Sequence, residues 1–502
     1  MQKKQTILVV ASLLVVVLSV TLAYFTAQII GKGKDVLVTS ADLKIIFTDT
    51  DGNIEGNDIT PGWSNSKTFT VKNESNGTYK YNIVIKDLVN TFVTKGYLQY
   101  KITSTNGGYN MTEFKDVPKS ETATDTILAY SASIDVEVTQ SYTVEFKYAN
   151  DESVDQSDDM GKTLSGTLYI EKGTLPKLAE KLFADNPTIG TRTDFKTTFT
   201  ETNTGTLYKA TESIAGNTPK DVYYFAGDAK NNWVKFANFY WRIIRTNHDG
   251  SIRLLYSGTS HNTTEGYIGK KVFNPTFTDP MYVGYMYGTS GSLASNRDNT
   301  NNSIIKNIVD DWYNNNLKSY TKYISTEAVY CNDRELASGS TYNTGNTKFY
   351  YASYGRLDTN KTPTYNCTNI KDAFSGSNAE AKLTYPIGLM TADEIIYAGG
   401  KVNTNLPSPY AWYYLNSAGG SITGETYWWS LSPMSWDGGG SYVWSVNGSS
   451  NPGNLNGYTV YNMTSAAWLG ARPAISLKSC TLWTSGNGTP ETPYEISTTS
   501  GC

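Results

Sequence analysis

This chain of 502 residues has few histidines and cysteines and no excess of basic charge. It contains two histidines, His248 and His261, and four cysteines, none of them in a CxxC pair. Protein zinc sites are usually built from clustered Cys and His ligands, so no metal site of that kind is predicted. Lys and Arg number 42 against 46 Asp and Glu, a net charge of −4. A chain without a basic field is poorly suited to neutralise phosphates, so no nucleic-acid partner is expected.

Aromatic residues are plentiful instead. The chain has 38 Tyr and 11 Trp, and aromatics make up 13% of it beside 39% hydrophobic and 18% charged residues. Such a composition can build packed cores, which argues against global disorder. Tyr and Trp supply large contact areas at small entropic cost, as recognition surfaces require. They also favour β-strands, so a β-rich fold explains them equally well.

The N-terminus predicts export. Lys3 and Lys4 precede a charge-free apolar run over residues 7–30. As a helix this run would span about 36 Å, enough to cross a bilayer. A secretory signal peptide has the same basic start followed by an apolar segment. We therefore expect residues 1–34 to be a signal peptide or membrane anchor, with the rest on the extracellular face, membrane-anchored or secreted; whether the segment is cleaved stays open.

Export makes disulfides permissible. The four cysteines, Cys331, Cys367, Cys480 and Cys502, all lie in the second half of the chain. We favour the pairs Cys331–Cys367 and Cys480–Cys502, although connectivity is not readable from a sequence. Buried free thiols are the alternative.

Short alternating runs separated by polar turns fill the next 130 residues. They predict strands at 43–48, 67–72, 79–86, 98–103, 141–148 and 163–171. In the second of these, Phe69 and Val71 are expected to point inward. Strands at this spacing, without a long helix, favour an all-β sandwich over residues 35–173.

Several motifs in this part resemble the camelysin/TasA-like family of Gram-positive surface and matrix proteins. They are AYFTA at 23–27, TSADLKI at 39–45, PGWS at 61–64 and KTFTVKN at 67–73. The resemblance covers residues 7–173 and implies a specialised signal peptide and a jelly-roll or Ig-like sandwich. Metalloprotease activity ascribed to some members needs metal ligands, and this segment contains no histidine. That activity is not carried over.

A weak calcium signal lies in the same segment. Asp49, Asp51 and Asn53 are spaced like the first ligands of a calcium loop. The glycine expected at the sixth position is absent, and Thr60 stands where the bidentate glutamate belongs. A plain Asp-Gly turn is therefore the favoured interpretation, and no cofactor is expected beyond this calcium alternative.

The second half predicts an α+β domain. A Thr/Asn/Gly-rich stretch with one short helix, 174–220, is expected to be a linker. Strands are predicted at 222–225, 239–245 and 252–256, with Ser303 capping a helix to 317. Thr391 and Glu394 form a capping box that opens a helix over 392–398. The domain is expected to span 221–479, followed by a tail over 480–502.

An unusual aromatic region lies near the C-terminus. Residues 427–471 contain nine aromatics and one charged residue, Asp437, among Ser, Gly and Asn. This mixture is typical of binding surfaces, where rigid aromatic anchors alternate with small hydrogen-bonding residues. Alternation predicts that Tyr442, Trp444 and Val446 share one face of a strand. An aromatic-rich sheet core is the alternative.

The same region carries a second resemblance. IGLMTADE at 387–394, YAGG at 397–400, YWWSLSP at 427–433 and GARPAISL at 470–477 occur in this order. CNDR at 331–334 and YNCTNIKD at 365–372 precede them. Together they resemble C-type-lectin-like domains of the variable proteins of diversity-generating retroelements, a fold shared with formylglycine-generating enzymes.

The resemblance implies a framework set and an exposed, diversified set. The framework positions would be Trp428, Leu431, Ser432, Pro433, Arg472 and Pro473. The ligand-binding positions would be Ser435, Trp436, Asp437, Tyr442, Trp444, Asn447, Tyr458 and Tyr461. The partner would be a protein or glycan at the cell surface.

Enzymatic alternatives have weaker support. Ser303 and Lys306 match the Ser-x-x-Lys of penicillin-recognising enzymes, but no Lys-Thr-Gly follows. Neither His248 nor His261 has an adjacent nucleophile in a recognisable motif. The leading hypothesis is a non-enzymatic cell-surface adhesin or receptor-like protein. A structural matrix or filament subunit is the second, and a secreted hydrolase the third.

Overall fold

The computed structural model describes residues 25–31, 36–40, 43–49, 54–461, 469–499 and 501–502. The chain divides into two compact units, Met1–Leu175 and Pro176–Cys502, described separately below as unit 1 and unit 2. Both are rich in β-structure, which confirms the β-rich expectation.

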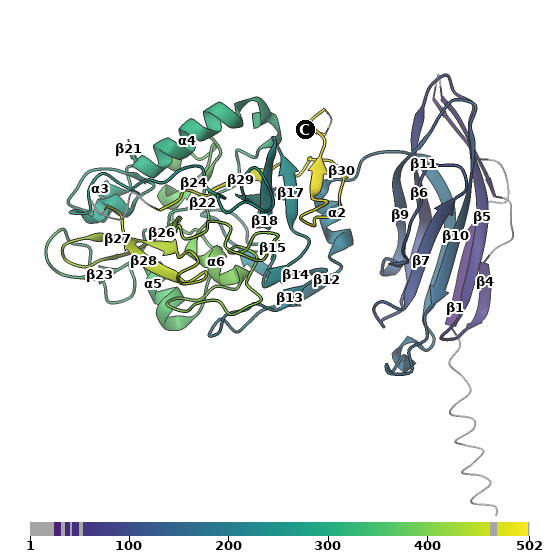
Figure 1. Ribbon diagram of the computed structural model, residues 1–502, viewed down its shortest axis with the longest axis horizontal. Helices are drawn as coiled ribbons and strands as arrows, with labels where there is room; N and C mark the ends of the chain where they lie inside the picture. Colours follow the sequence, from purple (N-terminus) through teal and green to yellow (C-terminus); the bar gives the residue numbers. More distant parts are fainter. Residues whose placement is uncertain (1–24, 32–35, 41–42, 50–53, 462–468, 500) are drawn as a thin grey trace, which may run out of the picture. The chain divides into compact units, whose positions relative to one another are not determined.

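Unit 1 consists of two sheets (Figure 1). The first has the order β4-β1-β11-β6-β9, with β1 Phe25–Gly31, β4 Ile54–Ile59, β6 Tyr79–Asn90, β9 Ser120–Ile134 and β11 Thr163–Lys172. The second has the order β2-β3-β5-β10-β7-β8, with β2 Val36–Ser40, β3 Leu43–Asp49, β5 Ser64–Asn73, β7 Leu98–Ser104, β8 Lys115–Asp116 and β10 Thr139–Tyr148. All six strands predicted for this segment are present.

Period-two alternation explains how the two sheets share one core. In β10, every second residue from Gln140 to Tyr148 is buried, and the residues between them are more exposed. β11 shows the same pattern, with Leu164, Leu168 and Ile170 inside. Because alternate side chains of a strand point to opposite faces, each sheet contributes one apolar face to a common buried cluster.

The helix predicted over residues 7–30 does not extend to residue 30. Phe25–Gly31 is a strand whose backbone pairs in parallel with β11 and antiparallel with β4, so these residues belong to a sheet rather than to a helix over 7–30. Residues 1–24 lie outside the described residues. Within the described part of the chain, no helix has the length and apolar character needed to span a bilayer.

The carboxylate of Asp49 is engaged by a lysine. Its Oδ1 lies 2.8 Å from Nζ of Lys67, and the side chains are 4% and 0% exposed. Asp51 and Asn53, the other two residues of the calcium alternative, lie outside the described residues. Among the described residues, no group of three or more acidic, Cys or His side chains is arranged to hold a metal.

Unit 2 is built around a ten-stranded sheet. Its main path is β12-β14-β15-β18-β17-β31-β30, and β19, β29 and β25 branch from β18. The bounds are β12 Thr188–Thr191, β14 Thr206–Glu212, β15 Lys220–Tyr224, β17 Trp233–Phe236, β18 Phe239–Thr246, β19 Ile252–Tyr256, β25 Gly388–Leu389, β29 Pro473–Leu477, β30 Trp483–Ser485 and β31 Tyr494–Ile496. The three strands predicted from residue 222 to 256 correspond to β15, β18 and β19.

A four-stranded sheet and three two-stranded ribbons complete the strands of unit 2. The sheet has the order β23-β26-β27-β28, with β23 Phe349–Tyr350, β26 Trp428–Trp436, β27 Ser441–Val446 and β28 Leu455–Thr459. The ribbons pair β13 Thr202–Asn203 with β16 Asp228–Ala229, β20 Met286–Tyr287 with β21 Asn301–Asn302, and β22 Tyr330–Cys331 with β24 Ala373–Phe374.

Helices α4 and α6 of unit 2 begin where the sequence signals place them. The main ones are α2 Leu178–Asp185, α4 Ile304–Asn316 and α6 Ala392–Ala398, with short turns α3 Leu293–Asn296 and α5 Ala352–Tyr354. Ser303 caps α4 by accepting a hydrogen bond from the Lys306 amide. Thr391 and Glu394 form the predicted capping box of α6.

Both predicted disulfides are confirmed. Cys331 is bonded to Cys367 and Cys480 to Cys502, so the described cysteines include no free thiol.

The expected linker over 174–220 and tail over 480–502 are both wrong. Within 174–220, helix α2 packs Leu178 and Leu182 into the core, and β14 is hydrogen-bonded between β12 and β15. In the tail, β31 pairs with β17 and with β30. These strands carry few apolar residues because they lie toward the edges of the sheet. In β14 only Leu207 and Glu212 are buried, so composition alone does not distinguish it from a loop.

Candidate functional site

The aromatic region near the C-terminus forms the four-stranded sheet. Tyr350 of β23 pairs with Ser435 of β26, Ser435 pairs with Tyr442 of β27, and Tyr442 pairs with Thr459 of β28. Residues directly opposite one another on neighbouring strands project to the same face of a sheet. These four side chains therefore form one row across all four strands.

Partly exposed tyrosines gather on that face. Tyr350 stacks on Tyr354 of α5 with ring centroids 4.0 Å apart, and Tyr354 stacks on Trp444 at 6.2 Å and 16°. Trp444 is fully buried, whereas Tyr350, Tyr354 and Tyr442 are partly exposed. We call Tyr350, Tyr354, Met434 and Tyr442 the tyrosine face. Its rings are supported from below by a buried indole.

Met434 reaches this face because a glycine leaves room for it. Gly457 is opposite Trp444, and a Cβ atom on Gly457 would lie 1.9 Å from Sδ of Met434. The β26–β27 register shifts on both sides of Pro433, a bulge that brings Ser435 opposite Tyr442. Methionine is flexible and polarisable, so it adapts to apolar or aromatic ligands of different shapes.

Two carboxylates border the face. Burial, and then a hydrogen bond to Asp437, raise the pKa of Tyr442. Burial, and then a hydrogen bond to Asp358, raise the pKa of Tyr354 to about 12. Both phenols therefore keep their protons at neutral pH and act as hydrogen-bond donors. The face combines aromatic surface with oriented polar groups.

Two of the predicted ligand-binding residues are in the core instead. Trp436 is 2% exposed and donates its indole N–H to the Gly345 carbonyl at 2.7 Å. Trp444 is 0% exposed and donates to the Ser353 hydroxyl at 3.0 Å. The prediction that these tryptophans are exposed is wrong, because Trp436 packs against the segment around Gly345 and Trp444 lies under Tyr354 of α5. For them the alternative of an aromatic-rich core holds.

The remaining predicted positions do not share one face. Tyr458 is opposite Val443, so it projects from the side of the sheet opposite to Tyr442, where it meets Trp429 edge-on at 6.1 Å. Tyr461 stacks with the exposed Phe277 at 6.4 Å. Ser435 and Asn447 are buried, at 4% and 7% exposure, whereas Asp437 is exposed. Of the eight, Tyr442 and Asp437 lie at the tyrosine face with accessible surface.

The predicted framework positions are buried as expected. Arg472 is 1% exposed, packs 4.8 Å from the Trp428 ring and donates to the carbonyl oxygens of Tyr413 and Tyr256. Leu431, Ser432, Pro433 and Pro473 are buried as well.

Sequence reasoning missed three residues of the tyrosine face, Tyr350, Tyr354 and Met434. The sequence does mark the two tyrosines, because residues 349–354 read FYYASY, a second cluster of aromatic residues. What the sequence does not reveal is that Tyr350 of β23 lies opposite Ser435 and that Tyr354 of α5 stacks on Trp444, both more than 80 residues further along the chain. Those neighbours follow from the strand pairing alone.

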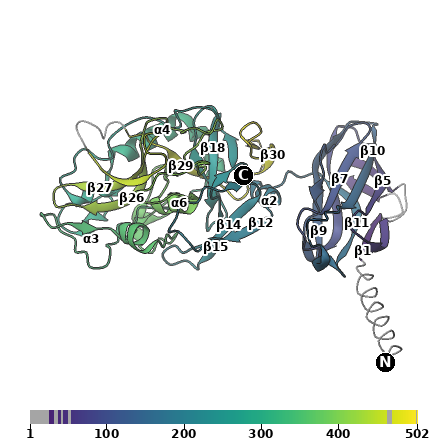
Figure 2. The same cartoon turned by 60° about the horizontal axis from the view of Figure 1, so that its bottom comes forward.

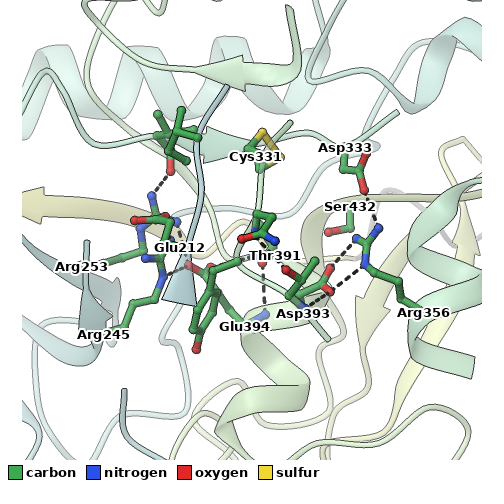
Figure 3. Close-up of a pocket in the computed structure, with 16 residues that line it drawn as sticks. Glu212, Arg245, Arg253, Cys331, Asp333, Arg356, Thr391, Asp393, Glu394 and Ser432 are labelled. Carbon is green, nitrogen blue, oxygen red and sulfur yellow. Dashed lines mark hydrogen bonds and ion pairs between the residues drawn. A yellow bond between two sulfur atoms is a disulfide. The ribbon is translucent and has the colours of Figure 1, made fainter. Parts of the chain in front are cut away.

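A buried ionic network occupies a second part of unit 2 (Figure 3). Glu394 of α6 accepts hydrogen bonds from Arg245 of β18 and Arg253 of β19, at 2.9 and 2.7 Å. Arg245 also binds Glu212 of β14 at 2.8 Å. Burial would raise the pKa of Glu394, but Arg253 and Arg245 outweigh it, so the pKa is lowered. The network ties the end of β14 to the centre of the unit.

The cavity beside this network is too small for a ligand larger than a water molecule. Its volume is about 20 Å³, the room of roughly one water molecule. The Cys331–Cys367 disulfide lines it, and Arg356 binds Asp333 and Asp393 across it at 2.7 and 3.0 Å. Its charged groups are engaged with one another, which is the arrangement that buried charges need for stability. The cavity is a structural ion-pair cluster.

The residues of the enzymatic hypotheses have structural partners. Lys306 binds Asp310 of its own helix, and His248 lies 3.2 Å from Glu212. His261 has its Nδ1 2.7 Å from Oγ of Ser417, a contact that the sequence did not indicate. The Ser417 hydroxyl also donates to the Asn262 side chain.

Ser417 also lines a cavity that is larger than the one beside the ionic network. This cavity measures about 170 Å³ and includes Trp233, Arg242 and Tyr410. Arg242 lies over the Trp233 ring at 4.2 Å and donates to the Leu415 carbonyl.

Comparison with known proteins gives a weak likeness among solved structures. No family model matches the chain, and no curated protein does. Among solved structures, a match is found to AvmM, which catalyses macrocyclization in alchivemycin A biosynthesis. It has 10% sequence identity and a TM-score of 0.16, and covers 28% of this chain and 98% of that one. A likeness at this score carries no argument about fold or function.

Proposed function

We propose that the protein is a cell-surface ligand-binding protein and that the tyrosine face of unit 2 contacts its partner, a protein or a glycan. The observation that carries the proposal is the row of partly exposed tyrosines over a buried indole. Rigid aromatic anchors with phenolic donors bury large area at small entropic cost and hydrogen-bond at the same time. Stacking of sugar rings or apolar side chains on Tyr350, Tyr354 and Tyr442 would supply most of the affinity.

One feature supports an extracellular setting, and another supports an accessible binding face. Both disulfides are typical of proteins that mature in an oxidising compartment. Within unit 2, β26 and β27 lie at the end away from α2, β30 and the C-terminus (Figures 1 and 2). Helix α5 lies on the same side (Figure 1). A face placed away from the points where the chain enters and leaves the unit is open to a partner.

The two resemblances belong to this proposal. Unit 2 would be a C-type-lectin-like domain of the retroelement-diversified kind, and unit 1 a camelysin/TasA-like sandwich that carries it. Diversification would then concentrate at Tyr442 and its exposed neighbours, whereas Trp436 and Trp444 would be constant because they are core. Sequencing the locus tests this: a reverse transcriptase gene and a near-copy of the codons for residues 427–477 should accompany the gene.

Binding itself is tested on arrays of glycans and of extracellular proteins. The purified full chain should bind defined spots, and the double variant Tyr350→Ala/Tyr442→Ala should lose that binding. Tyr458→Ala is the matched control, since Tyr458 lies on the same sheet but projects from its opposite side. Equal signals from all three proteins would exclude the tyrosine face as the binding site.

A further inference from the structure

Arg242 of β18 is a buried cation in the wall of the cavity that Ser417 lines, which measures about 170 Å³. The residue is 1% exposed. Its guanidinium donates to Oδ1 of Asn232 at 2.7 Å and to the carbonyl oxygens of Ala229 and Leu415 at 3.0 and 3.3 Å. All three acceptors are uncharged. Because a guanidinium has five N–H donors, two of them have no acceptor among the described residues.

Positive charge exceeds negative charge around this cavity. Asp228, the carboxylate in the lining, has Oδ2 2.5 Å from Nζ of Lys230, so that ammonium already balances it. Burial, and then the nearby guanidinium of Arg472, lower the pKa of Arg242 to about 9, and Asp228 opposes them. Arg242 nevertheless stays protonated at neutral pH. Since a buried charge is costly unless an opposite charge lies close to it, one more negative charge would stabilise the site.

The space beside Arg242 accommodates one ring. A cavity of about 150 Å³ admits a ligand the size of benzene, and this cavity is slightly larger, at about 170 Å³. Pro409, Tyr410 and Pro490 line it and are exposed or partly exposed, so flat apolar surfaces are available for a ring to stack on. Ser408 adds an exposed hydroxyl to the same wall. The lining therefore combines a buried cation with surfaces that suit a small cyclic molecule.

We propose that this cavity is a binding site for a small organic carboxylate carried on a single ring, either a sugar acid or an aromatic acid. The carboxylate accepts hydrogen bonds from the two remaining N–H donors of Arg242, and the ring lies against Tyr410. Charge-assisted hydrogen bonds of this kind are roughly twice as strong as neutral ones. Lys230, whose side chain is 50% exposed, adds attraction for the anion. None of these residues belongs to the tyrosine face, so the site is independent of the function proposed above.

Titration of the full chain with two matched pairs of probes, followed by ligand-observed NMR, tests the charge requirement. D-Glucuronate is compared with D-glucose, and benzoate with benzyl alcohol. In at least one pair the carboxylate should bind about tenfold or more tightly than its uncharged counterpart, because only the carboxylate compensates the charge of Arg242. The pair that shows the preference identifies the ring as a sugar or an aromatic ring. Equal affinity within both pairs, or no binding of any of the four probes, would overturn the proposal.

Variants locate the site. Arg242→Gln should abolish the preference for the carboxylate. If this buried substitution prevents folding, Lys230→Gln provides the test, since loss of that cation should weaken carboxylate binding several-fold. Lys235→Gln is the matched control, because Lys235 is exposed on the neighbouring strand β17 and lies outside the cavity lining. The double variant Tyr350→Ala/Tyr442→Ala should bind the carboxylate like the wild type.

Three results would place the anion elsewhere and refute the site. They are carboxylate binding that is unchanged in Arg242→Gln or Lys230→Gln, an equal loss in Lys235→Gln, and a loss in the tyrosine-face variant. Failure of the tyrosine face to bind a protein or glycan leaves these outcomes unaffected, so the two proposals are tested separately.

Discussion

The indole N–H of Trp444 donates a hydrogen bond of 3.0 Å to the hydroxyl of Ser353. That hydroxyl in turn donates to the Pro433 carbonyl, so the contact links β27, α5 and the bulge of β26. Trp444 is thus a supporting residue of the tyrosine face, although its position in an alternating strand suggests an exposed anchor.

Truncation of Trp444 should therefore destabilise unit 2, whereas truncation of Tyr442 should not. Trp444→Ala leaves a cavity and an unpaired hydroxyl, and about 3–5 kcal/mol of unfolding free energy should be lost. Tyr442→Ala removes a partly exposed ring and should cost about 1 kcal/mol or less. Chemical denaturation followed by Trp fluorescence measures both. Similar losses for the two variants would place Tyr442 in the core and remove it from the tyrosine face.

Gly457→Ala should disturb the face without removing any aromatic residue. The added Cβ would displace the Met434 side chain that covers this position. We expect ligand binding to weaken at least several-fold with little change in melting temperature, because one partly exposed side chain moves. Gly439→Ala, in the exposed turn before β27, is the control and should bind normally. Unchanged binding by Gly457→Ala would show that Met434 takes no part.

The ionic network predicts acid sensitivity. Burial would raise the pKa of Glu212, but Arg245 and the hydrogen bond to His248 lower it to about 2 from the ordinary 4.5. A carboxylate with a depressed folded-state pKa stabilises the fold above its unfolded pKa, and this contribution is lost as the pH falls. Unfolding free energy should therefore drop by about 3 kcal/mol between pH 4.5 and 2. In Glu212→Gln, denaturation midpoints measured over this range should fall less steeply; an unchanged slope would contradict the prediction.

The Cys331–Cys367 disulfide should contribute measurably to the stability of unit 2. It closes a segment with a sequence separation of 36, and a cross-link of this span is worth roughly 3–4 kcal/mol through the entropy of the unfolded chain. The variant Cys331→Ser/Cys367→Ser should melt at a lower temperature in scanning calorimetry. The Cys480→Ser/Cys502→Ser variant is the comparison for a bridge at the C-terminus. A Cys331/Cys367 variant as stable as the wild type would show that the ion pairs around the cavity stabilise this part of unit 2 without the disulfide.

The revised boundary of unit 2 can be checked by truncation. A chain over residues 176–502 should give a cooperative thermal transition, whereas residues 221–502 should not. The shorter chain lacks α2, β12 and β14, and with β14 it loses the Glu212 partner of Arg245. Cooperative folding of 221–502 would restore the linker interpretation.

Local signals in the sequence predict the regular elements well. Six strands of unit 1, the Ser303 cap and the Thr391–Glu394 capping box follow from alternation and capping chemistry, which depend on near neighbours in the chain. Strands near the edge of the sheet, such as β14, escape prediction because they bury only one apolar residue, Leu207 in β14. The apolar run at 7–30 predicted a helix through residue 30, yet residues 25–31 pair as a strand with β11. That pairing depends on residues more than 130 positions away.

The candidate site was predicted less well, for a related reason. Composition singled out the aromatic region correctly as unusual but could not separate supporting from exposed rings. Trp444 and Tyr442 occupy the same face of β27, and only the presence of α5 over one of them decides which is covered. Tyr458 was placed beside Tyr442 although the register of β28 directs it to the other side.

The chain ends of unit 2 are held together. The backbone amide of Leu178 donates to the Thr481 carbonyl, that of Trp483 donates to the Pro176 carbonyl, and the Cys480–Cys502 bridge fixes the last residue beside them. Domains whose first and last residues lie side by side tolerate insertion into a loop of another protein. We therefore expect residues 176–502 to fold when inserted into a loop of an unrelated carrier, with the tyrosine face left unobstructed.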